Sequence, residues 1–521
     1  MTDQLQSILD SIGGVIWGPF VLIPLLFLTG LYLTIRLGGI QFLRLGAALN
    51  LGIIRRRDPG SSGDISQFQA LTTALAATVG TGNIVGVATA IGIGGPGALF
   101  WMWVTGLLGM ASKYTEAFLG VRFRQADSKG ERNGGPQYYL EKGIRGPLGK
   151  ILAWSFTIFA VFACFGIGNL TQSNSISANV EHSFGIPTWA TGVVLTVFVL
   201  VVLVGGIKSI GKVTAGFVPI MIVFYVVAAL YILFANIGDV PAAIGLVFAD
   251  AFTGTAAAGG FAGSVFIIAI QYGFARGIFS NESGMGSAAI AAAAAQTSHP
   301  VRQGLVSMTQ TFIDTIIVVT MTGLVIITTG TYTSIDPETG EQLSPALMTG
   351  QAFSNGLPGE WGHWIVTIGL VMFAASTILG WAYYGERNIV RIFGRRIVTP
   401  FRIVFSLIVF VGATTQLAIA WSFSDMMNGL MAIPNLIGLI ILSGLVARET
   451  RAYLRFDPKL RASSAEIEQA LADEPGYQAW RAREAELDLQ SGHSPQRPAT
   501  HQIDAIGLDA EEPDDLPAPR R

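Results

Sequence analysis

Apolar stretches of about 20 residues recur along this chain, and they restrict its possible fold more than any other feature of the sequence. At roughly 1.5 Å rise per residue, a helix of about 20 residues matches the ~30 Å hydrocarbon core of a bilayer. Of the 521 residues, 51% are hydrophobic and only 13% are charged, whereas soluble domains average about 25% charged residues. The sequence therefore predicts an all-α polytopic membrane protein.

Eleven of these stretches are long enough to be transmembrane helices. They cover residues 16–35, 67–93, 97–121, 151–173, 187–206, 212–235, 262–287, 303–329, 361–384, 400–420 and 427–447. No basic segment precedes the first stretch, as it would in a cleaved signal peptide, so this stretch is expected to remain in the protein as a helix.

Lys and Arg residues lie in alternate connections between the expected spans. The largest groups, at 55–57, 122–150 and 387–396, follow the first, third and ninth spans, and there is no Lys or Arg before the first span or after any even-numbered one. Basic residues are retained on the cytoplasmic side. The protein is therefore expected in the cell membrane, with its N-terminus outside and its C-terminus in the cytoplasm.

The second expected span is interrupted at its middle by glycines and small polar residues. It reads Ala-Leu-Ala-Ala-Thr-Val-Gly-Thr-Gly-Asn-Ile-Val-Gly from Ala74 to Gly86. A backbone that leaves the helix at bilayer depth must find hydrogen-bond partners inside the protein or in a cavity, so a broken helix there indicates a ligand site. The alternative is packing, because Gly82 and Gly86 have the spacing that lets two helices approach closely.

A second interruption is expected at residues 271–284, in the seventh span. It contains Arg276 and Glu282, and a charge within an apolar span costs at least ~2.5 kcal/mol unless it is paired or hydrated. Four continuous spans lie between the two interrupted ones, and four more follow. The fold class predicted is thus one N-terminal helix plus a five-plus-five inverted repeat with two discontinuous helices, an arrangement that points to a transporter's central site.

This reading divides the chain into four parts. An N-terminal helix and loop occupy residues 1–66, the two repeats occupy 67–236 and 262–447, and a cytoplasmic tail occupies 448–521. Within the tail, one amphipathic helix is expected from Ser464 to Leu489, and the last thirty residues read as disordered. The external loop from about 330 to 360 is either a solvated connection or a set of short helices that cap a vestibule.

Five sequence blocks resemble the alanine or glycine:cation symporter family, also called sodium:alanine symporters. They lie at 76–91, 94–103, 133–140, 277–288 and 376–386, and the fourth reads Gly-Ile-Phe-Ser-Asn-Glu-Ser-Gly-Met-Gly-Ser-Ala. The resemblance covers roughly residues 10–450. It implies a leucine-transporter-type fold of the amino acid-polyamine-cation superfamily with one additional N-terminal helix, which agrees with the five-plus-five count.

An amino acid zwitterion needs hydrogen-bond donors for its carboxylate and acceptors for its ammonium group, and the two ends of a broken helix supply both. The carboxylate is expected at the amides of Thr81 and Gly82, with Asn83 beside them. The ammonium group is expected at carbonyls around Thr78 and, from the second interruption, at the carbonyls of Phe274 and Ala275.

Side chains from three other segments complete the expected substrate site. Gln172 is either a partner of the substrate carboxylate or an interfacial residue. Gly277 and Ile278 belong to the second interruption. The resemblance implies a small pocket for alanine or glycine, which Ile278 and Trp381 close sterically, although Trp381 is equally plausible as an anchor at the membrane interface.

Sodium is the expected coupling ion. Ser376 and Thr377 offer adjacent hydroxyls in the ninth span, and the resemblance pairs them with the carbonyls of Ala76 and Val79. The alternative is that both hydroxyls bond back to the preceding helical turn, as Ser and Thr often do. A second cation position is expected at Asn83 and the Thr78 carbonyl, completed by the substrate's own carboxylate.

Three further groups of charged residues have expected roles. Asp314, in the eighth span, is expected to pair with Arg276 or to relay protons. Lys113 is expected to reach water or to pair locally. Glu282, Glu386 and Arg387 are expected to form part of one network of charged residues at an inner gate.

The sequence thus predicts a secondary active symporter that couples sodium, or possibly proton, flow to uptake of alanine, glycine or a similar small amino acid. No enzyme activity, cofactor or nucleic acid partner is expected: there is no phosphate-binding Gly-x-x-x-x-Gly-Lys-Ser/Thr loop and no Gly-x-Ser-x-Gly elbow. The alternatives are a proton-coupled carrier with another substrate, in which Lys212 would be a buried ammonium in place of sodium, and, with less support, a channel.

Overall fold

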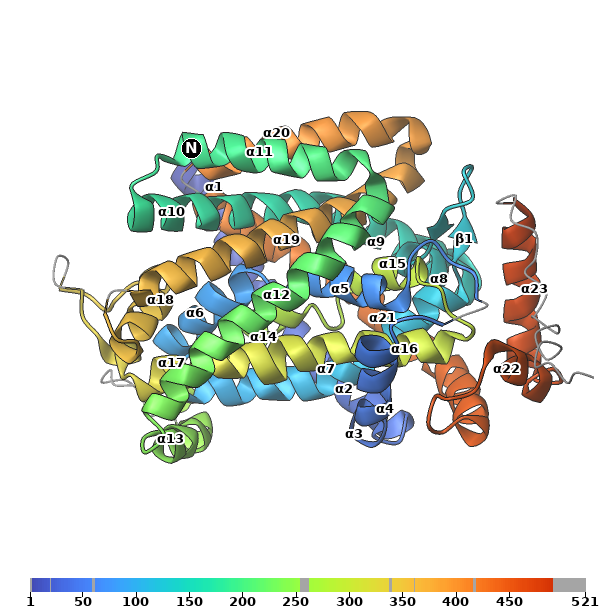
Figure 1. Ribbon diagram of the computed structural model, residues 1–521, viewed down its shortest axis with the longest axis horizontal. Coiled ribbons are helices and arrows are strands. Elements are labelled where there is room, and N and C mark those ends of the chain that lie inside the picture. Colours follow the sequence, from blue (N-terminus) through green and yellow to red (C-terminus); the bar gives the residue numbers. More distant parts are fainter. Residues whose placement is uncertain are drawn as a thin grey trace, which may run out of the picture.

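The protein is almost entirely helical. The computed structural model describes residues 2–18, 20–58, 61–253, 262–336, 340–359, 361–415 and 418–490. In this part of the chain the one sheet pairs two short antiparallel strands, β1 (Gln125–Ala126) and β2 (Arg132–Asn133). Most long helices run side by side along the longest axis of the molecule (Figure 1), which confirms the predicted all-α class.

The elements of the first half of the chain are α1 (Thr2–Ile16), α2 (Leu22–Arg36), α3 (Ile40–Leu43), α4 (Leu45–Leu49), η1 (Asn50–Arg55), α5 (Gln67–Thr78), η2 (Gly82–Gly86), α6 (Val87–Gly94), α7 (Gly97–Arg122), α8 (Pro136–Gly143), α9 (Pro147–Phe165), η3 (Gly166–Leu170), α10 (Thr171–Phe184), α11 (Thr188–Val204), α12 (Gly206–Ala235) and α13 (Val240–Thr253).

Those of the second half are α14 (Ala262–Asn281), α15 (Ala288–Ala293), α16 (Pro300–Thr311), η4 (Phe312–Val319), α17 (Thr320–Thr328), η5 (Thr331–Thr333), α18 (Pro345–Gly356), α19 (Trp361–Phe393), η6 (Arg395–Ile397), α20 (Val398–Thr414), α21 (Ala418–Phe456), α22 (Ser464–Ala470) and α23 (Pro475–Gln490).

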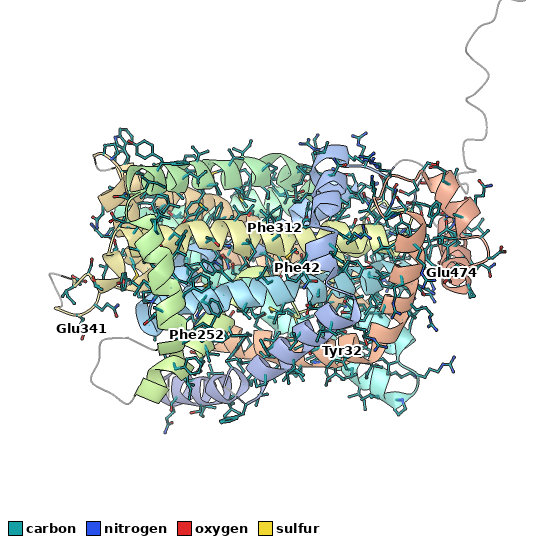
Figure 2. All side chains as sticks on the ribbon, turned by 90° about the horizontal axis from the view of Figure 1, so that it is seen from below. Tyr32, Phe42, Phe252, Phe312, Glu341 and Glu474 are labelled. Atoms are coloured by element: carbon teal, nitrogen blue, oxygen red, sulfur yellow. The ribbon has the colours of Figure 1, made fainter. Side chains whose placement is uncertain are left out.

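Six helical stretches among the described residues are long and apolar enough to cross a bilayer by themselves, and the bent pair formed by α5 and η2–α6 makes a seventh. Large apolar side chains such as Phe42 and Phe252 are exposed on the flank of the molecule, whereas Glu341 and Glu474 lie at its opposite ends (Figure 2). This distribution fits a protein whose flanks face lipid. The count of eleven spans remains a prediction.

The first interruption lies where the sequence predicts it. Ser66 begins α5 with a capping box, in which its hydroxyl and the Gln69 side chain satisfy each other's backbone amides. The helix ends at Thr78, Val79 is extended, and η2 begins at Gly82 with a bend of 54° between the two parts. The chain therefore leaves the helix in the middle of an apolar segment.

The second interruption lies later than predicted. α14 is continuous through residues 271–281, and the chain leaves the helix only at Glu282, after which α15 begins at Ala288. The small residues inside α14 serve packing: a Cβ atom on Gly273 would lie 2.6 Å from the Ala98 carbonyl oxygen of α7. The expectation that the Phe274 and Ala275 carbonyls are free is therefore wrong, because both lie inside this continuous helix.

The loop expected outside the membrane contains a helix rather than a simple solvated connection. Within it, α18 packs over the first interrupted helix: the Thr349 hydroxyl donates to the Ile84 carbonyl at 3.1 Å, and the Met348 side chain lies against Gly92. The loop thus contains a short helix, as in the second expectation, and the vestibule that it would cap stays a prediction.

Within the described part of the tail, the single helix expected from Ser464 to Leu489 is replaced by two helices. α22 begins with a capping box at Ser463, and α23 begins at Pro475, which cannot continue a preceding helix. Both lie at the end of the molecule opposite α13 and α18 (Figure 1). The prediction of disorder for the last thirty residues concerns residues outside the described part.

Cys164, the single cysteine of the sequence, is fully buried. Its thiol donates to the Val161 carbonyl at 3.0 Å, and a Cβ atom on Gly385 would lie only 2.4 Å from its sulfur. The side chain therefore occupies a tight contact between α9 and α19.

Candidate functional site

The first interruption exposes two backbone amides to polar side chains. The Gly80 amide donates to Asn83 Oδ1 at 2.9 Å, and the Thr81 amide donates to Gln172 Oε1 at 3.2 Å. Gln172 is buried, so it is not an interfacial residue. The Thr81 hydroxyl is buried and has no hydrogen-bond partner among the described residues, which marks this place as one where a polar ligand group would complete the bonding.

The hydroxyls of α19 converge on the carbonyls that end α5. Thr377 Oγ1 lies 3.0 Å from the Ala76 carbonyl oxygen and 3.5 Å from that of Val79, and Ser376 Oγ lies 3.3 Å from the former. Both hydroxyls also donate to the Phe373 carbonyl, at 2.8 and 3.1 Å. Since each hydroxyl has one proton, it can donate to the Ala76 or to the Phe373 carbonyl but not fully to both. The hydroxyls thus lie where both expected arrangements place them, and the sodium site stays a prediction.

A carboxylate that sequence reasoning did not include in the site lies against Asn83. Asp314 accepts hydrogen bonds from Asn83 Nδ2 at 2.7 Å, from the Ser280 hydroxyl at 2.9 Å and from the Thr315 hydroxyl at 2.8 Å, and all four side chains are buried. The expected pairing of Asp314 with Arg276 is wrong. The available signal was the position of Asp314, an acidic residue in the interior of an apolar span.

On α14, the residues nearest the first interruption are not the expected ones. A Cβ atom on Gly82 would lie 3.0 Å from Ser280 Cα and 3.1 Å from the Phe279 ring. By contrast, Gly277 packs against Thr105 of α7. The other expected residues lie on further faces: Phe274 contacts the rings of Phe27 and Trp101, Ile278 borders a small cavity beside α2 and α7, and Ala275 lines an external cavity.

That external cavity has a volume of about 180 Å³ and lies between α1, α14 and α21. Arg276 lines it and pairs with Asp425 at 3.2 Å. The Arg276 guanidinium also lies over the stacked rings of Phe279 and Trp421, at 5.6 and 6.0 Å from their centres. An ion pair and an aromatic pair thus separate this cavity from the interruption.

Trp381 is buried in the protein interior and is not an interface anchor. Its indole nitrogen donates to Glu282 Oε1 at 2.7 Å. A Cβ atom on Gly168 of η3 would lie 2.2 Å from Trp381 Cβ, so the tryptophan packs directly against the segment that leads to Gln172. Trp381 also follows Thr377 by one helical turn on α19.

The charged residues expected in one inner gate network belong to separate clusters. Glu386 pairs with Arg402 at 2.6 Å, whereas Arg387 pairs with Glu131 at 2.7 Å. Burial alone would raise the pKa of Glu131, but the hydrogen bonds from Arg395 and the charge of Arg387 outweigh this effect and lower it to about 2.

Two lysines differ in their surroundings. Lys113 is buried, pairs with Glu116 at 3.9 Å and donates to the Glu282 carbonyl at 2.9 Å, so it does not reach water and the expected local pairing is confirmed. Lys212 is exposed, which contradicts the alternative that a buried Lys212 ammonium stands in place of sodium.

The helix broken inside an apolar segment and the long apolar helices around it are features of a multi-pass membrane protein. The fold is similar to that of MhsT, whose structure in complex with L-phenylalanine matches with a TM-score of 0.53 at 13% identity, covering 83% of this chain and 100% of that chain. Residues 2–466 match the sequence model of the sodium:alanine symporter family, and the chain belongs to that family.

Individual relatives are similar over nearly their whole length. The sodium/alanine symporter AgcS of Methanococcus maripaludis is 51% identical over 450 residues, which are 86% of this chain and 97% of that protein. The probable sodium/glutamine symporter GlnT of Bacillus subtilis is 34% identical over 498 residues, 94% of this chain and 99% of that protein. These comparisons confirm the family predicted from the sequence and support a sodium-coupled amino acid symporter; the family and the named relatives are transporters rather than enzymes.

Proposed function

We propose that the protein carries alanine, glycine or a similarly small amino acid into the cell together with sodium, by alternating access. The observation that carries this proposal is the convergence of the Ser376 and Thr377 hydroxyls on the Ala76 and Val79 carbonyls, directly beside the interrupted backbone at Thr81. A cation and a zwitterion bound there would share one short segment of chain, which is what coupling requires.

The substrate carboxylate is assigned to the amides of Thr81 and Gly82, with Gln172 and the unpartnered Thr81 hydroxyl beside them. Close approach of the Gly82 backbone to Ser280 and Phe279 and the buried Trp381 ring support a small pocket. The name of AgcS favours alanine, whereas that of GlnT makes glutamine the principal alternative.

Sodium is assigned to the Ala76 and Val79 carbonyls with Ser376 and Thr377, since sodium is a hard cation that prefers oxygen ligands. A second cation position at Asn83 and the Thr78 carbonyl is supported by Asp314, whose buried carboxylate adds negative charge beside Asn83.

The larger architecture is part of the proposal. Residues 1–66 form the additional N-terminal helix and its loop, 67–236 and 262–447 form two inverted repeats with eleven spans in total, and 448–521 form a cytoplasmic tail. The N-terminus is assigned to the outside. Rocking of one group of helices against another would open the site alternately to each side.

Uptake of labelled alanine by proteoliposomes that contain the purified protein tests the function. Uptake is expected to require an inward sodium gradient and to stop when choline replaces sodium at fixed pH. Unlabelled glycine should compete strongly and leucine weakly. Uptake that persists in choline and follows a pH gradient would overturn the proposal in favour of proton coupling, and stronger competition by glutamine than by glycine would overturn the substrate assignment.

A further inference from the structure

We propose that Glu282 is a positioning residue that limits the size of the transported side chain by fixing the indole of Trp381. This inference rests on the proposed function, because it requires that the substrate lies between Thr81, Gln172 and Trp381. Glu282 lies at the second interruption and would act on the substrate pocket only through the Trp381 side chain.

The contact between the two residues is direct and buried. Trp381 Nε1 donates to Glu282 Oε1 at 2.7 Å, and each residue is only 1% exposed. An indole nitrogen has one proton and is a donor only, so this carboxylate oxygen determines how the ring is turned. The hydrogen bond to an ionised or polarised carboxyl group in a dry interior also holds the ring more strongly than a bond in water would.

Glu282 itself is held in place from several directions. Its second carboxylate oxygen accepts from the Ser287 hydroxyl at 2.5 Å, its amide donates to the Ile278 carbonyl at 2.8 Å, and its own carbonyl accepts from Lys113 Nζ at 2.9 Å. It also has a φ of 54°, in the left-handed region that non-glycine residues rarely adopt. A residue kept in this conformation by its neighbours presents its carboxylate at one defined place.

Trp381, whose ring Glu282 orients, lies beside two segments of the candidate site. Trp381 is one helical turn from Thr377 on α19, and its Cβ atom contacts the Gly168 segment, which is one turn from Gln172. A ring released from Glu282 would be able to turn away from this position. The pocket would then admit larger side chains, and the preference for small amino acids would decrease.

The test compares alanine with leucine in proteoliposomes, as the ratio of the two kcat/KM values. Replacement E282A removes the acceptor and is expected to reduce this ratio at least tenfold. Replacement E282Q keeps an oxygen that can accept from the indole and is expected to preserve the ratio within about twofold. A general loss of folding would instead lower uptake of both substrates together.

E116Q is the matched control. Glu116 belongs to the same buried polar region, where it accepts from the Gly286 amide at 3.0 Å and from Asn435 at 2.8 Å and pairs with Lys113 at 3.9 Å, but none of these contacts involves the indole. Its replacement is expected to leave the ratio unchanged, whatever it does to the amount of folded protein. If E282A does not assemble, S287A replaces it, because loss of the Ser287 hydroxyl loosens the same carboxylate and should shift the ratio in the same direction.

The inference is overturned if E282A, or S287A in its place, keeps the wild-type ratio, or if E282Q changes it as much as E282A does. This failure is distinct from failure of the proposed function. If only this inference fails, the wild-type protein still takes up alanine with sodium. If the proposed function fails, the wild-type protein does not.

Discussion

Thr377 is the residue on which the proposed coupling depends most directly. Its hydroxyl lies near two carbonyls at the end of α5 and bonds back to its own helix. A valine has nearly the same shape but offers no oxygen, so replacement removes one expected ligand with little change in packing.

T377V is expected to raise the sodium concentration for half-maximal alanine uptake roughly tenfold, which corresponds to about 1.4 kcal/mol. The measurement is uptake against sodium concentration. T367V is the control, since Thr367 lies on the same helix but bonds to Ser183 at 2.7 Å. Equal sodium dependence of T377V and the wild type would contradict the assignment of this hydroxyl to sodium.

At the scale of single elements, the sequence pattern predicts the first interruption correctly but not the position of the second. The first combines glycines with small polar residues in an apolar segment, and these residues neither favour helix nor pack as lipid-facing side chains. In the second, Gly273 and Gly277 have the same composition signal, but α7 covers them at close range and the helix continues. Local sequence does not reveal this packing partner, so the interruption, and the Phe274 and Ala275 assignments with it, were placed too early.

α16 begins with a histidine cap, His299. His299 Nδ1 accepts from the Val301 amide at 3.1 Å, and the ring is buried against Tyr453 and Tyr477. Burial, together with the nearby charge of Arg302, lowers the pKa of His299 well below 6.5.

The unfolded chain therefore takes up a proton at His299 near pH 6.5, while the folded chain does not. The His299 contribution to stability is complete above that pH and decreases by about 1.4 kcal/mol per pH unit as pH falls toward the folded pKa. H299N keeps a side chain that can cap the helix but does not titrate. Between about pH 7.5 and about pH 5.5, the midpoint temperature of thermal unfolding should decrease less steeply for H299N than for the wild type. Parallel curves would refute this prediction.

At the scale of the whole molecule, the tail is more closely attached than its composition indicates. Arg124, just after α7, is fully buried and pairs with Glu484 of α23 at 2.7 Å. It also donates to the carbonyls of Ala293, Ala295 and Ser62. This one guanidinium thus connects the segment before α5, the end of α15 and the tail.

E484Q is expected to loosen α23, because it leaves the Arg124 charge buried without its counter-ion. Trypsin should then cut at Arg481 and Arg483 roughly tenfold faster. This increase corresponds to a free energy of detaching α23 that is about 1.4 kcal/mol lower. E486Q, on the exposed face of the same helix, should leave the rate unchanged. Equal rates for both variants would show that the pair does not hold the tail.

The architecture was predictable to different degrees for physical reasons. Long apolar segments identify membrane helices because lipid requires them, and the hydroxyl pair on α19 was recognisable because the family resemblance supplied its partners. α1 is amphipathic rather than apolar, and α23 is mostly polar, so neither has a strong signal of its own. Asp314 and Glu282 acquire their roles only from residues distant in the chain.

Cys164 gives the protein a practical property for spectroscopy. The sequence contains no other cysteine, and the Cys164 thiol is enclosed between α9 and α19, where a maleimide reagent cannot reach it while these helices stay packed. Cysteines introduced at the external cavity and along α23 would therefore be the groups that react. Pairs of fluorophores attached there would report whether the distance between these two places changes during transport, without first preparing a cysteine-free variant.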